Sequence, residues 1–551
     1  MINFAKHFST TFTAILLTLT TPCLSQSNGF EVIRSLELLD QIYEHLEKYY
    51  VNDIEAGRLS KTAIDAVLKD LDPYTIYYHE SNIEDYKLMT TGQYGGIGAL
   101  IRKNNNYVYI SEPYKDKPAE KSGLKAGDKI LVIDGKGMKN KSSSDISKIL
   151  KGPKGSEVEI KIERDIGERK TIKTFTVYRD EIKLPDVPYS GMLNETTGYI
   201  KLNSFTKTAS SAVKSSFLQL KNEGMKELIL DLRGNGGGLL IEAVRIVNMF
   251  VEKNQVVVST KGRLEEENNT YKTMADPLDI EIPLIVLIDR RSASASEIVS
   301  GSLQDLDRAL IIGEESFGKG LVQRTYNLKY GSKVKLTIAK YYTPSGRCVQ
   351  RLDYYDKNNL EKVSEIADSL IKKFKTKNGR TVTDGRGIEP DIKLEPKLLS
   401  PITKTLFKEN FLFDYATSYY YKNDSIEKAS KFKLSETEYT DFINYVLNQE
   451  FSYSTKSEII LKDVREKLEK EGLFEDAKIE YNALMDRIVP SKQNDLIKFK
   501  SEIKSILENE IISRYYYQSG RAQNSLKEDI VINKSIEVLK DIDNYNHLLG
   551  N

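Results

Sequence analysis

The sequence predicts a multidomain fold of the α/β and β classes, with a helical segment, a β-rich domain, an α/β domain and a second helical domain in that order. Three observations predict this. The chain has 551 residues, enough for three or four domains that each bury a core. Near both ends, apolar residues recur at three- and four-residue spacing, which is typical of helices. Between the ends, short strands give way near residue 182 to alternating strands and helices, which indicates a largely parallel sheet.

The overall composition excludes some classes of protein. Lys and Arg number 81 and Asp and Glu number 80, so the formal net charge is +1. This balance gives no electrostatic reason to expect a nucleic-acid partner. The two cysteines, Cys23 and Cys348, form no C-x-x-C pair and cannot build a disulfide framework.

The first 25 residues have the pattern of a secretory signal peptide. Lys6 and His7 precede a short apolar run, and small residues follow it, with Ser25 as the expected last residue before cleavage. An uncleaved membrane anchor is the alternative reading of the same run. We therefore expect an exported protein of the periplasm or cell envelope.

Local patterns set the expected domain boundaries. Pro73 in "LDPY" interrupts the first helical segment, and "SSSDISKILKG" predicts a helix that begins at a Ser N-cap and stops at Gly152. The last segment carries no chemical motif, so we expect a packing or assembly domain. The expected boundaries are a signal peptide at 1–25, a helical segment at 31–88, a β-rich domain at 89–181, an α/β core at 182–397 and a helical domain at 398–551.

Three segments of the α/β core carry candidate chemistry at the ends of strands, where sites gather in such sheets. They are "DLRGNGGG" (Asp231–Gly238), "RRSASASEI" (Arg290–Ile298) and the turn that contains Lys319. The glycine-rich loop is not a dinucleotide fingerprint, because Leu239 stands at the sixth position of that motif. Its flexible backbone can still direct N–H groups toward an anion.

The turn "GEESFGKG", Gly313–Gly320, comes close to a phosphate-binding loop. Gly320 stands where that loop needs a Ser or Thr hydroxyl for magnesium. The residues that follow predict strands, whereas the loop must open a helix. Nucleotide binding is therefore disfavoured, and from this stretch alone Lys319 would be an ordinary surface lysine.

Ser294 is a candidate nucleophile because it stands at the predicted start of a helix. There the helix dipole is positive, and the N–H of the next residue can bind an oxyanion. However, Ser294 and Glu297 also fit a capping box, and on the pattern alone capping is the favoured explanation.

A catalytic serine needs a base, and the sequence offers few. The histidines are His7, His45, His79 and His547, so none lies between residues 80 and 546. A Ser-His-Asp triad is excluded unless His79 or His547 folds back into the site. Lysine is the remaining option, as in Ser-Lys hydrolases. Lys319 would then have to be neutral, with burial near cationic groups lowering its pKa from about 10.4 toward 7.

The motifs "SASASEIVSGSLQDLDRALIIGEESFGKGLVQ", "AKYYTPSGR", "GRGIEPDI", "LDLRGNGGGLL" and "LDPY" together resemble the C-terminal processing peptidases, or tail-specific proteases. The resemblance runs from about residue 31 to 397. It implies that the α/β core is a crotonase/ClpP-like peptidase domain. It also implies serine peptidase chemistry that needs no metal or organic cofactor.

The resemblance assigns roles to individual residues. It implies that Ser294 is the nucleophile, that Lys319 is the general base and that Gln323 steadies the lysine. A spacing of four would keep Lys319 and Gln323 on one face of a strand. The implied oxyanion donors are the N–H groups of Ala295 and of the Gly236–Gly237 turn.

Other polar residues of these motifs are expected to be structural. Ser292 and Ser296 flank the nucleophile, and Glu297 braces the start of the helix. Asp305 would lie about 16 Å from Ser294 along a continuous helix, too far for contact. Cys348, without a nearby histidine, is expected to be a spectator.

Residues 89–181 resemble a PDZ domain through "QYGGIGAL" and "SGLKAGDKILVIDG". The resemblance implies that Gly95, Gly96, Ile97 and Gly98 form a loop that receives the terminal carboxylate of a peptide. The peptide would add as a strand at the sheet edge. The expected partners are therefore proteins and peptides with free C-termini.

The sequence as a whole predicts an exported serine endopeptidase that recognises C-terminal tails and cleaves by a Ser-Lys dyad. Two alternatives remain open at this point. One is a catalytically silent PDZ scaffold that binds C-terminal tails in the envelope, and the other is an exported esterase or amidase. Natural substrates, membrane association, self-association and dependence on an adaptor protein are left open by the sequence.

Overall fold

A computed structural model describes residues 28–80, 83–166, 169–354, 364–395 and 398–550. The expected signal peptide at 1–25 lies outside these residues. No helix in the described ranges is both long enough and apolar enough to cross a membrane. The chain divides into two units, Met1–Tyr77 and Tyr78–Asn551, which are taken in turn.

The first unit contains two helices, α1 (Asn28–Tyr49) and α2 (Ala56–Lys69). The turn after α2 is the "LDPY" segment. Asp72 accepts hydrogen bonds from the backbone N–H groups of Tyr74 and Thr75, both at 2.8 Å, and from the Thr75 hydroxyl at 2.9 Å. An aspartate that caps its own following turn ends the helical segment as Pro73 predicts.

The β-rich domain is an antiparallel sheet of order β3-β4-β5-β7-β8, with β6 beside β5. Its strand β3 lies at an edge, and the pair β2–β9 forms a separate ribbon. Ser142 and Asp145 form a capping box at the start of α5, which ends at Leu150, two residues before Gly152. The elements are α3 (Ile83–Thr91), β2 (Gln93–Gly96), β3 (Ala99–Asn104), β4 (Tyr107–Pro113), α4 (Pro118–Lys121), β5 (Lys129–Ile133), β6 (Lys136–Gly137), α5 (Ser143–Leu150), β7 (Glu157–Ile166), β8 (Arg169–Tyr178) and β9 (Asp180–Lys183).

The α/β core is built on a sheet of order β10-β11-β12-β15-β16-β23, parallel except for β10. Every residue of β15 and β16 is buried, as expected for a parallel sheet that is covered on both faces. The elements are β10 (Tyr189–Met192), β11 (Thr197–Lys201), α6 (Ala209–Asn222), β12 (Glu227–Asp231), α7 (Leu240–Val247), β15 (Leu284–Ile288), α8 (Ala295–Asp305), β16 (Leu310–Gly313) and β23 (Ile392–Lys393).

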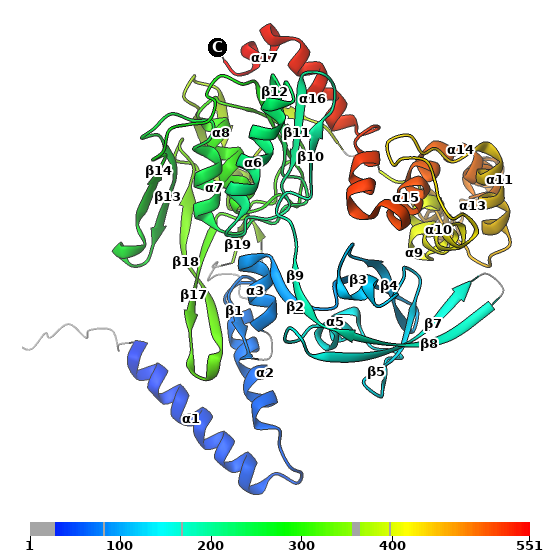
Figure 1. Cartoon of the computed structure of the whole chain (residues 1–551), viewed down its shortest axis with the longest axis horizontal. Coiled ribbons are helices and arrows are strands. Elements are labelled where there is room, and N and C mark those ends of the chain that lie inside the picture. The colour runs from blue at the N-terminus through cyan, green and yellow to red at the C-terminus, as the bar shows by residue number, and fades with distance from the viewer. Residues whose placement is uncertain (1–27, 81–82, 167–168, 355–363, 396–397, 551) are drawn as a thin grey trace, which may run out of the picture. The chain divides into compact units, whose positions relative to one another are not determined.

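The two faces of this sheet have different covers. Alternate strand residues such as Leu230 and Val286 pack against α6, α7 and α8. The residues between them, such as Ile229 and Ile285, pack against the two helices at the end of the chain, α16 (Ile530–Lys540) and α17 (Ile542–Leu548). Figure 1 shows these helices, in red, beside β10, β11 and β12. The C-terminal helices therefore form part of the core of the α/β domain.

A second, antiparallel sheet joins β17 to β18, β18 to β13 and β13 to β14. The residues after Lys319 are thus strands, as the sequence predicts, and not the helix that a phosphate-binding loop requires. The elements are β13 (Val256–Gly262), β14 (Asn269–Lys272), β17 (Leu321–Asn327), β18 (Lys333–Tyr342) and the short strands β19 (Leu352–Asp353), β20 (Ser364–Glu365), β21 (Lys373–Lys375) and β22 (Thr381–Thr383).

The remaining C-terminal helices have an apolar core of their own, in which Phe442, Leu496 and Ile511 are fully buried. The expected domain at 398–551 therefore divides between this core and the α/β sheet. The helices are α9 (Pro401–Lys408), α10 (Phe411–Lys422), α11 (Glu436–Leu447), α12 (Lys456–Glu471), α13 (Phe474–Ile488), α14 (Lys492–Lys498) and α15 (Lys500–Ser525).

Candidate active site

The three segments singled out in the sequence follow three neighbouring strands. The glycine-rich loop follows β12, the turn before Ser294 follows β15 and the turn with Lys319 follows β16. These strands are parallel and adjacent in the sheet, so their carboxyl ends meet at one edge. This arrangement explains why segments distant in sequence converge on one site.

Ser294 is half-buried and lies directly before α8, whose residues are all buried. Its backbone has φ +56° and ψ −113°, a conformation that costs a residue with a side chain about 1–3 kcal/mol. The neighbours of Ser294 hold this turn in place. The Ala293 N–H and the Ser296 hydroxyl both bond to the Asn235 carbonyl, at 3.0 and 2.9 Å.

Ser292 is tied to the same glycine-rich loop. Its buried hydroxyl donates to the carbonyl of Leu232 at 2.9 Å. The hydroxyls of Ser292 and Ser296 therefore fasten the nucleophile turn to the loop after β12, which agrees with the structural roles expected for them.

The glycine-rich loop packs directly against Ser294. Gly237 has φ +98°, and a Cβ built there would lie 2.9 Å from the Ser294 Cβ and 3.0 Å from the Ala295 nitrogen. Glycine is therefore required at this position for both conformation and space. The Gly237 N–H donates to the Asn235 side chain at 2.9 Å, so it is not available to an oxyanion in this geometry. The oxyanion role expected for Gly236, Gly237 and Ala295 stays a prediction, and in this geometry Gly236 and Ala295 are its stronger candidates.

Glu297 links the two turns of the predicted dyad. One of its oxygens, Oε2, accepts the backbone N–H of Ser294 at 2.7 Å and that of Lys319 at 2.9 Å. The other, Oε1, accepts the Ser316 hydroxyl at 2.6 Å and the Gly318 N–H at 2.7 Å. Burial raises the pKa of Glu297, and these four hydrogen bonds oppose that effect.

The sequence predicts only part of the role of Glu297 as a link between the two turns. The bond to the Ser294 N–H is the capping contact that the pattern indicates. The bonds to Gly318 and Lys319 were missed, because a capping box says nothing about a partner on another strand. The signal that could have found them is the tight "FGKG" turn, whose N–H groups need an acceptor once buried.

Lys319 is half-buried and lies in the turn before β17, between two glycines that are sterically required. A Cβ on Gly318, which has φ +86°, would lie 2.5 Å from the Arg351 Cβ. A Cβ on Gly320 would lie 2.8 Å from the Gln350 nitrogen, and the Gly320 N–H donates to the Gln350 side chain at 2.8 Å. The backbone on either side of Lys319 is thus fixed by close packing.

Gln323 lies in β17 opposite Thr337, to whose hydroxyl its side-chain amide donates at 3.3 Å. Strand β17 begins at Leu321, so Lys319 precedes it. The alternation of side chains along a strand therefore does not apply between Lys319 and Gln323, contrary to the argument from their spacing.

Tyr341 is a site residue that the sequence analysis missed. It is fully buried in β18, its hydroxyl donates to the Ser294 carbonyl at 3.3 Å, and its N–H donates to the Gly320 carbonyl at 2.9 Å. Burial raises the pKa of Tyr341, so its hydroxyl stays protonated. In the sequence this residue is indistinguishable from any other strand tyrosine.

Asp305 and Cys348 are expected to take no direct part in the chemistry, and their surroundings fit this expectation. Asp305 forms a fully buried ion pair with Arg347 at 2.8 Å, as suits a structural role. Burial raises the pKa of the Cys348 thiol, which keeps it in the unreactive protonated form.

His547 does not enter the site. It is exposed on α17, two residues after Tyr545, whose hydroxyl bonds to Leu284 at the amino end of β15. Ser294 lies beyond the carboxyl end of that strand, which spans about 13 Å.

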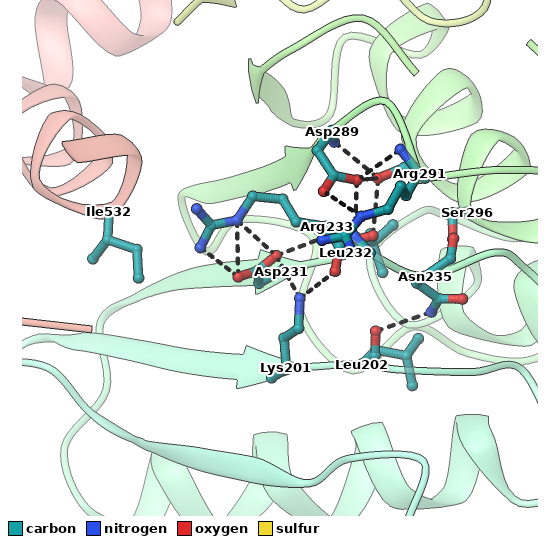
Figure 2. A network of polar contacts seen from close by, with 12 residues as sticks. Lys201, Leu202, Asp231, Leu232, Arg233, Asn235, Asp289, Arg291, Ser296 and Ile532 are labelled. Carbon is teal, nitrogen blue, oxygen red and sulfur yellow. Dashed lines mark hydrogen bonds and ion pairs between the residues drawn. The ribbon is translucent and has the colours of Figure 1, made fainter. Parts of the chain in front are cut away.

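A network of charged side chains around the buried Asp231 supports the base of the glycine-rich loop (Figure 2). Lys201 and Arg233 converge on the buried carboxylate of Asp231, at 3.1 and 2.6 Å. Burial alone would raise the pKa of Asp231, but the charges of Arg233 and Lys201 outweigh it and hold that pKa well below its usual range. Arg233 also forms an ion pair with Asp529, at 2.8 Å.

The glycine loop of the β-rich domain is only partly available to a ligand. Gly95 is paired within the β2–β9 ribbon, and its N–H already donates to the carboxylate of Glu84 at 2.8 Å. Gly98 has φ +72° and leads directly into the edge strand β3. Gly96 is paired in the same ribbon, opposite Asp180, so Ile97 and Gly98 are the two of the four expected residues that lie outside it. Their role in binding a carboxylate stays a prediction.

Comparison with known families agrees with this architecture. The model of peptidase family S41 matches residues 196–354, and the model of a PDZ domain matches residues 95–177. A third model, described as the C-terminal helical domain of a probable PDZ-protease, matches residues 402–539.

Individual relatives point the same way. A protein of Staphylococcus saprophyticus subsp. saprophyticus, described as a probable CtpA-like serine protease, is 31% identical over 418 residues, covering 72% of this chain and 83% of the relative. Its counterpart in Staphylococcus aureus strain N315 is 34% identical over 321 residues, covering 57% of this chain and 62% of the relative. A solved structure described as the photosystem II D1 C-terminal processing protease is 28% identical, covers 65% of this chain and 87% of that one, and has a TM-score of 0.36.

The fold and the matched families define a serine protease that carries a PDZ domain and a C-terminal helical domain. The chain belongs to peptidase family S41 and is similar to its CtpA-like serine proteases. The family resemblance and the fold class predicted from the sequence are thereby confirmed.

Proposed function

We propose that this chain is an exported endopeptidase that binds the C-terminal tails of proteins through its PDZ domain and cleaves them with a Ser294–Lys319 dyad. The observation that carries the proposal is the bridging position of Glu297. One oxygen of this buried carboxylate accepts the N–H groups of both Ser294 and Lys319. The backbones of the two residues are thus fixed relative to each other, which a nucleophile and its base require.

In the proposed reaction, the Ser294 hydroxyl attacks the peptide carbonyl and neutral Lys319 takes its proton. The N–H groups of Ala295 and Gly236 stabilise the oxyanion. Lys319 then returns a proton to the leaving amine, and a water molecule hydrolyses the acyl-enzyme with Lys319 again as base. Gln323, next to this turn at the start of β17, steadies the lysine.

The PDZ domain supplies the proposed tail recognition. Strand β3 is an edge strand, and α5 contacts it. A peptide that pairs with β3 would run as an additional strand and would end at the turn formed by Gly96, Ile97 and Gly98. Export rests on the signal-peptide pattern of residues 1–25.

Substitution of the dyad tests the proposal. With casein as an unstructured substrate, Ser294→Ala and Lys319→Arg should each lower the rate of cleavage by about 10⁴-fold or more. Arginine keeps the positive charge but cannot act as a base, so its failure distinguishes catalysis from anion binding. Ser300→Ala is the matched control, because the Ser300 hydroxyl bonds to the Ser296 carbonyl within α8. Near-normal turnover by either dyad variant would overturn the proposal.

A further inference from the structure

Asp529, near the end of the chain, lies at the start of α16 and contacts the catalytic domain. Its two carboxylate oxygens have separate partners. Oδ1 accepts the N–H groups of Val531 and Ile532, at 2.9 and 3.2 Å, and so caps the helix. Oδ2 forms the 2.8 Å ion pair with Arg233. A helix cap needs only the hydrogen bonds of Oδ1. The ion pair between Oδ2 and Arg233 therefore requires a separate explanation.

Arg233 is the second residue after β12, at the base of the glycine-rich loop. Its guanidinium is held between Asp231 on one side and Asp529 on the other. Its backbone is fixed as well, because its carbonyl accepts the Lys201 ammonium and its N–H donates to Asp231 at 2.8 Å. These contacts of Arg233 fix the base of the glycine-rich loop in place.

The position of this loop matters for the nucleophile. Gly234 is bonded to Asp289 at 2.8 Å, Asn235 accepts from Ala293 and Ser296, and Gly237 packs against Ser294. A shift at Arg233 is therefore transmitted through consecutive residues to Gly236, the proposed oxyanion donor. Such donors act by being fixed where charge develops, so a small displacement lowers the rate of the chemical step.

Asp529 also balances the charge of the network. Lys201 and Arg233 carry two positive charges, and Asp231 and Asp529 carry two negative charges. The side chains of Lys201, Arg233 and Asp529 are each about one-fifth exposed, and that of Asp231 is buried. Removing the Asp529 charge would leave an excess positive charge in a poorly solvated site, which favours movement of Arg233 toward solvent.

We infer that Asp529 is a positioning residue of the active site, through which the C-terminal helix α16 holds Arg233 and the oxyanion loop in their active geometry. The inference rests on the proposed function of Ser294 and Gly236. It predicts that the catalytic domain reaches full activity only with α16 docked.

Two substitutions separate the two contacts of Asp529. Asn and Ser are both good N-caps, so Asp529→Asn and Asp529→Ser keep the cap of α16. Both remove the charge that faces Arg233. In the full chain, each should lower kcat for a fluorogenic peptide by about 10-fold and leave KM within about 2-fold, because substrate contacts are unchanged.

Asp541→Asn is the matched control. Asp541 caps the next helix, α17, by accepting the Asn544 N–H at 3.1 Å, and it should tolerate Asn with kcat within about 2-fold of the unaltered enzyme. Melting temperatures of all variants show whether the caps are retained. If Asp529→Asn melts lower than Asp541→Asn by enough to explain its loss of kcat, the role of Asp529 is structural and the inference is wrong.

A double-mutant cycle gives the decisive result. If Asp529 acts through Arg233, Asp529→Asn should have no further effect on kcat in an Arg233→Gln background. Equal effects in both backgrounds would overturn the inference. Ser294→Ala, assayed in parallel, keeps the proposed function separate: an active Ser294→Ala enzyme refutes the dyad, whereas an inactive one with unimpaired Asp529→Asn refutes only the role of Asp529.

Discussion

At the scale of single residues, the carboxylate of Glu297 connects the two turns of the proposed dyad. It is fully buried and satisfies four donors on two segments: the Ser294 N–H directly before α8, and three donors of the turn after β16, namely the Ser316 hydroxyl and the N–H groups of Gly318 and Lys319. Burial of a carboxylate is unfavourable unless its oxygens are hydrogen-bonded. The ionised carboxylate of Glu297 therefore favours the arrangement in which the Ser294 turn and the Lys319 turn lie together and both donate to it.

We predict that Glu297→Gln lowers kcat by about 10–100-fold, because the amide places an N–H₂ donor against backbone N–H donors and separates the two turns. Steady-state kinetics on a peptide substrate measures the effect. Glu438→Gln is the control, since Glu438 caps α11 in the same way and accepts the Ser435 N–H at 2.7 Å, outside the active site. Similar losses in the two variants would show that the effect is not specific to the dyad.

The raised pKa of Glu297 also has a consequence for stability. The folded protein holds a proton on this group more tightly than the unfolded chain does, whose pKa is near the ordinary 4.5. The stability contributed by this protonation is full below that value and is lost as the pH rises through the raised pKa. Relative to Glu297→Gln, the unaltered enzyme should therefore lose stability across this window and show no further change above it, as measured by denaturant unfolding at a series of pH values.

At the scale of elements, the site depends on turns that only glycine can form. Gly98, Gly237 and Gly318 all have positive φ and all lie against other chain segments. A sequence motif finds such turns readily, because glycine repeats after predicted strands are unusual and because neighbouring parallel strands end at one edge. For this reason the segments of Ser294, Lys319 and the glycine-rich loop could all be identified from the sequence.

The detailed contacts of those segments could not be predicted in the same way. Whether the N–H of Gly237 faces an oxyanion or the Asn235 side chain depends on a rotation of one peptide unit, which leaves no trace in residue type. From the sequence alone, Tyr341 is indistinguishable from other strand residues, and Asp529 is indistinguishable from other N-cap residues. Their roles arise from contacts with distant parts of the chain, and periodicity carries information only about near neighbours.

The turn of the PDZ domain that we propose as the carboxylate-binding site allows a matched test of an element. Gly98 has φ +72°, and a Cβ there would lie 2.6 Å from the Lys117 Cβ, whereas Gly135 has φ +73° and no atom within 4 Å. Alanine should cost similar backbone strain at both sites, about 1 kcal/mol, but should displace the chain only at Gly98. We predict that Gly98→Ala weakens binding of a peptide with a free C-terminus by about 10-fold or more, and that Gly135→Ala changes it by less than about 2-fold.

Fluorescence anisotropy with labelled peptides measures this binding, and an amidated peptide provides the second control. It should bind the unaltered protein poorly, because it lacks the carboxylate. Equal affinity for free and amidated tails would contradict the proposed pocket.

At the scale of the whole molecule, one face of the peptidase sheet is completed by the end of the chain. Tyr545 is buried, and its hydroxyl accepts the Leu284 N–H at 3.0 Å and donates to the Leu284 carbonyl at 3.1 Å. Around it, Val538, Leu539 and Leu549 cover strand residues such as Ile285 and Ile312. The sheet that positions Ser294 therefore depends on α16 and α17 for its core.

We predict that Tyr545→Phe destabilises the peptidase domain by about 1–3 kcal/mol, because the buried N–H of Leu284 loses this acceptor. Amide hydrogen exchange of β15 should accelerate accordingly. Tyr439→Phe is the control: its hydroxyl donates to the Leu496 carbonyl at 2.7 Å within the separate helical core, so exchange in β15 should not change. Unaltered protection of β15 in Tyr545→Phe would show that this contact adds nothing to the sheet.

The hydrogen bonds between Tyr545 and Leu284 also have a consequence for the order in which the sheet and its cover are synthesised. The two residues are 261 positions apart, so a ribosome that adds about 5–20 residues per second adds Tyr545 roughly 13–52 s after Leu284. During that interval this face of the catalytic sheet lacks the apolar residues that α16 and α17 contribute to its core. The strands that place Ser294 therefore gain the cover of this face only after α16 and α17 have been added to the growing chain.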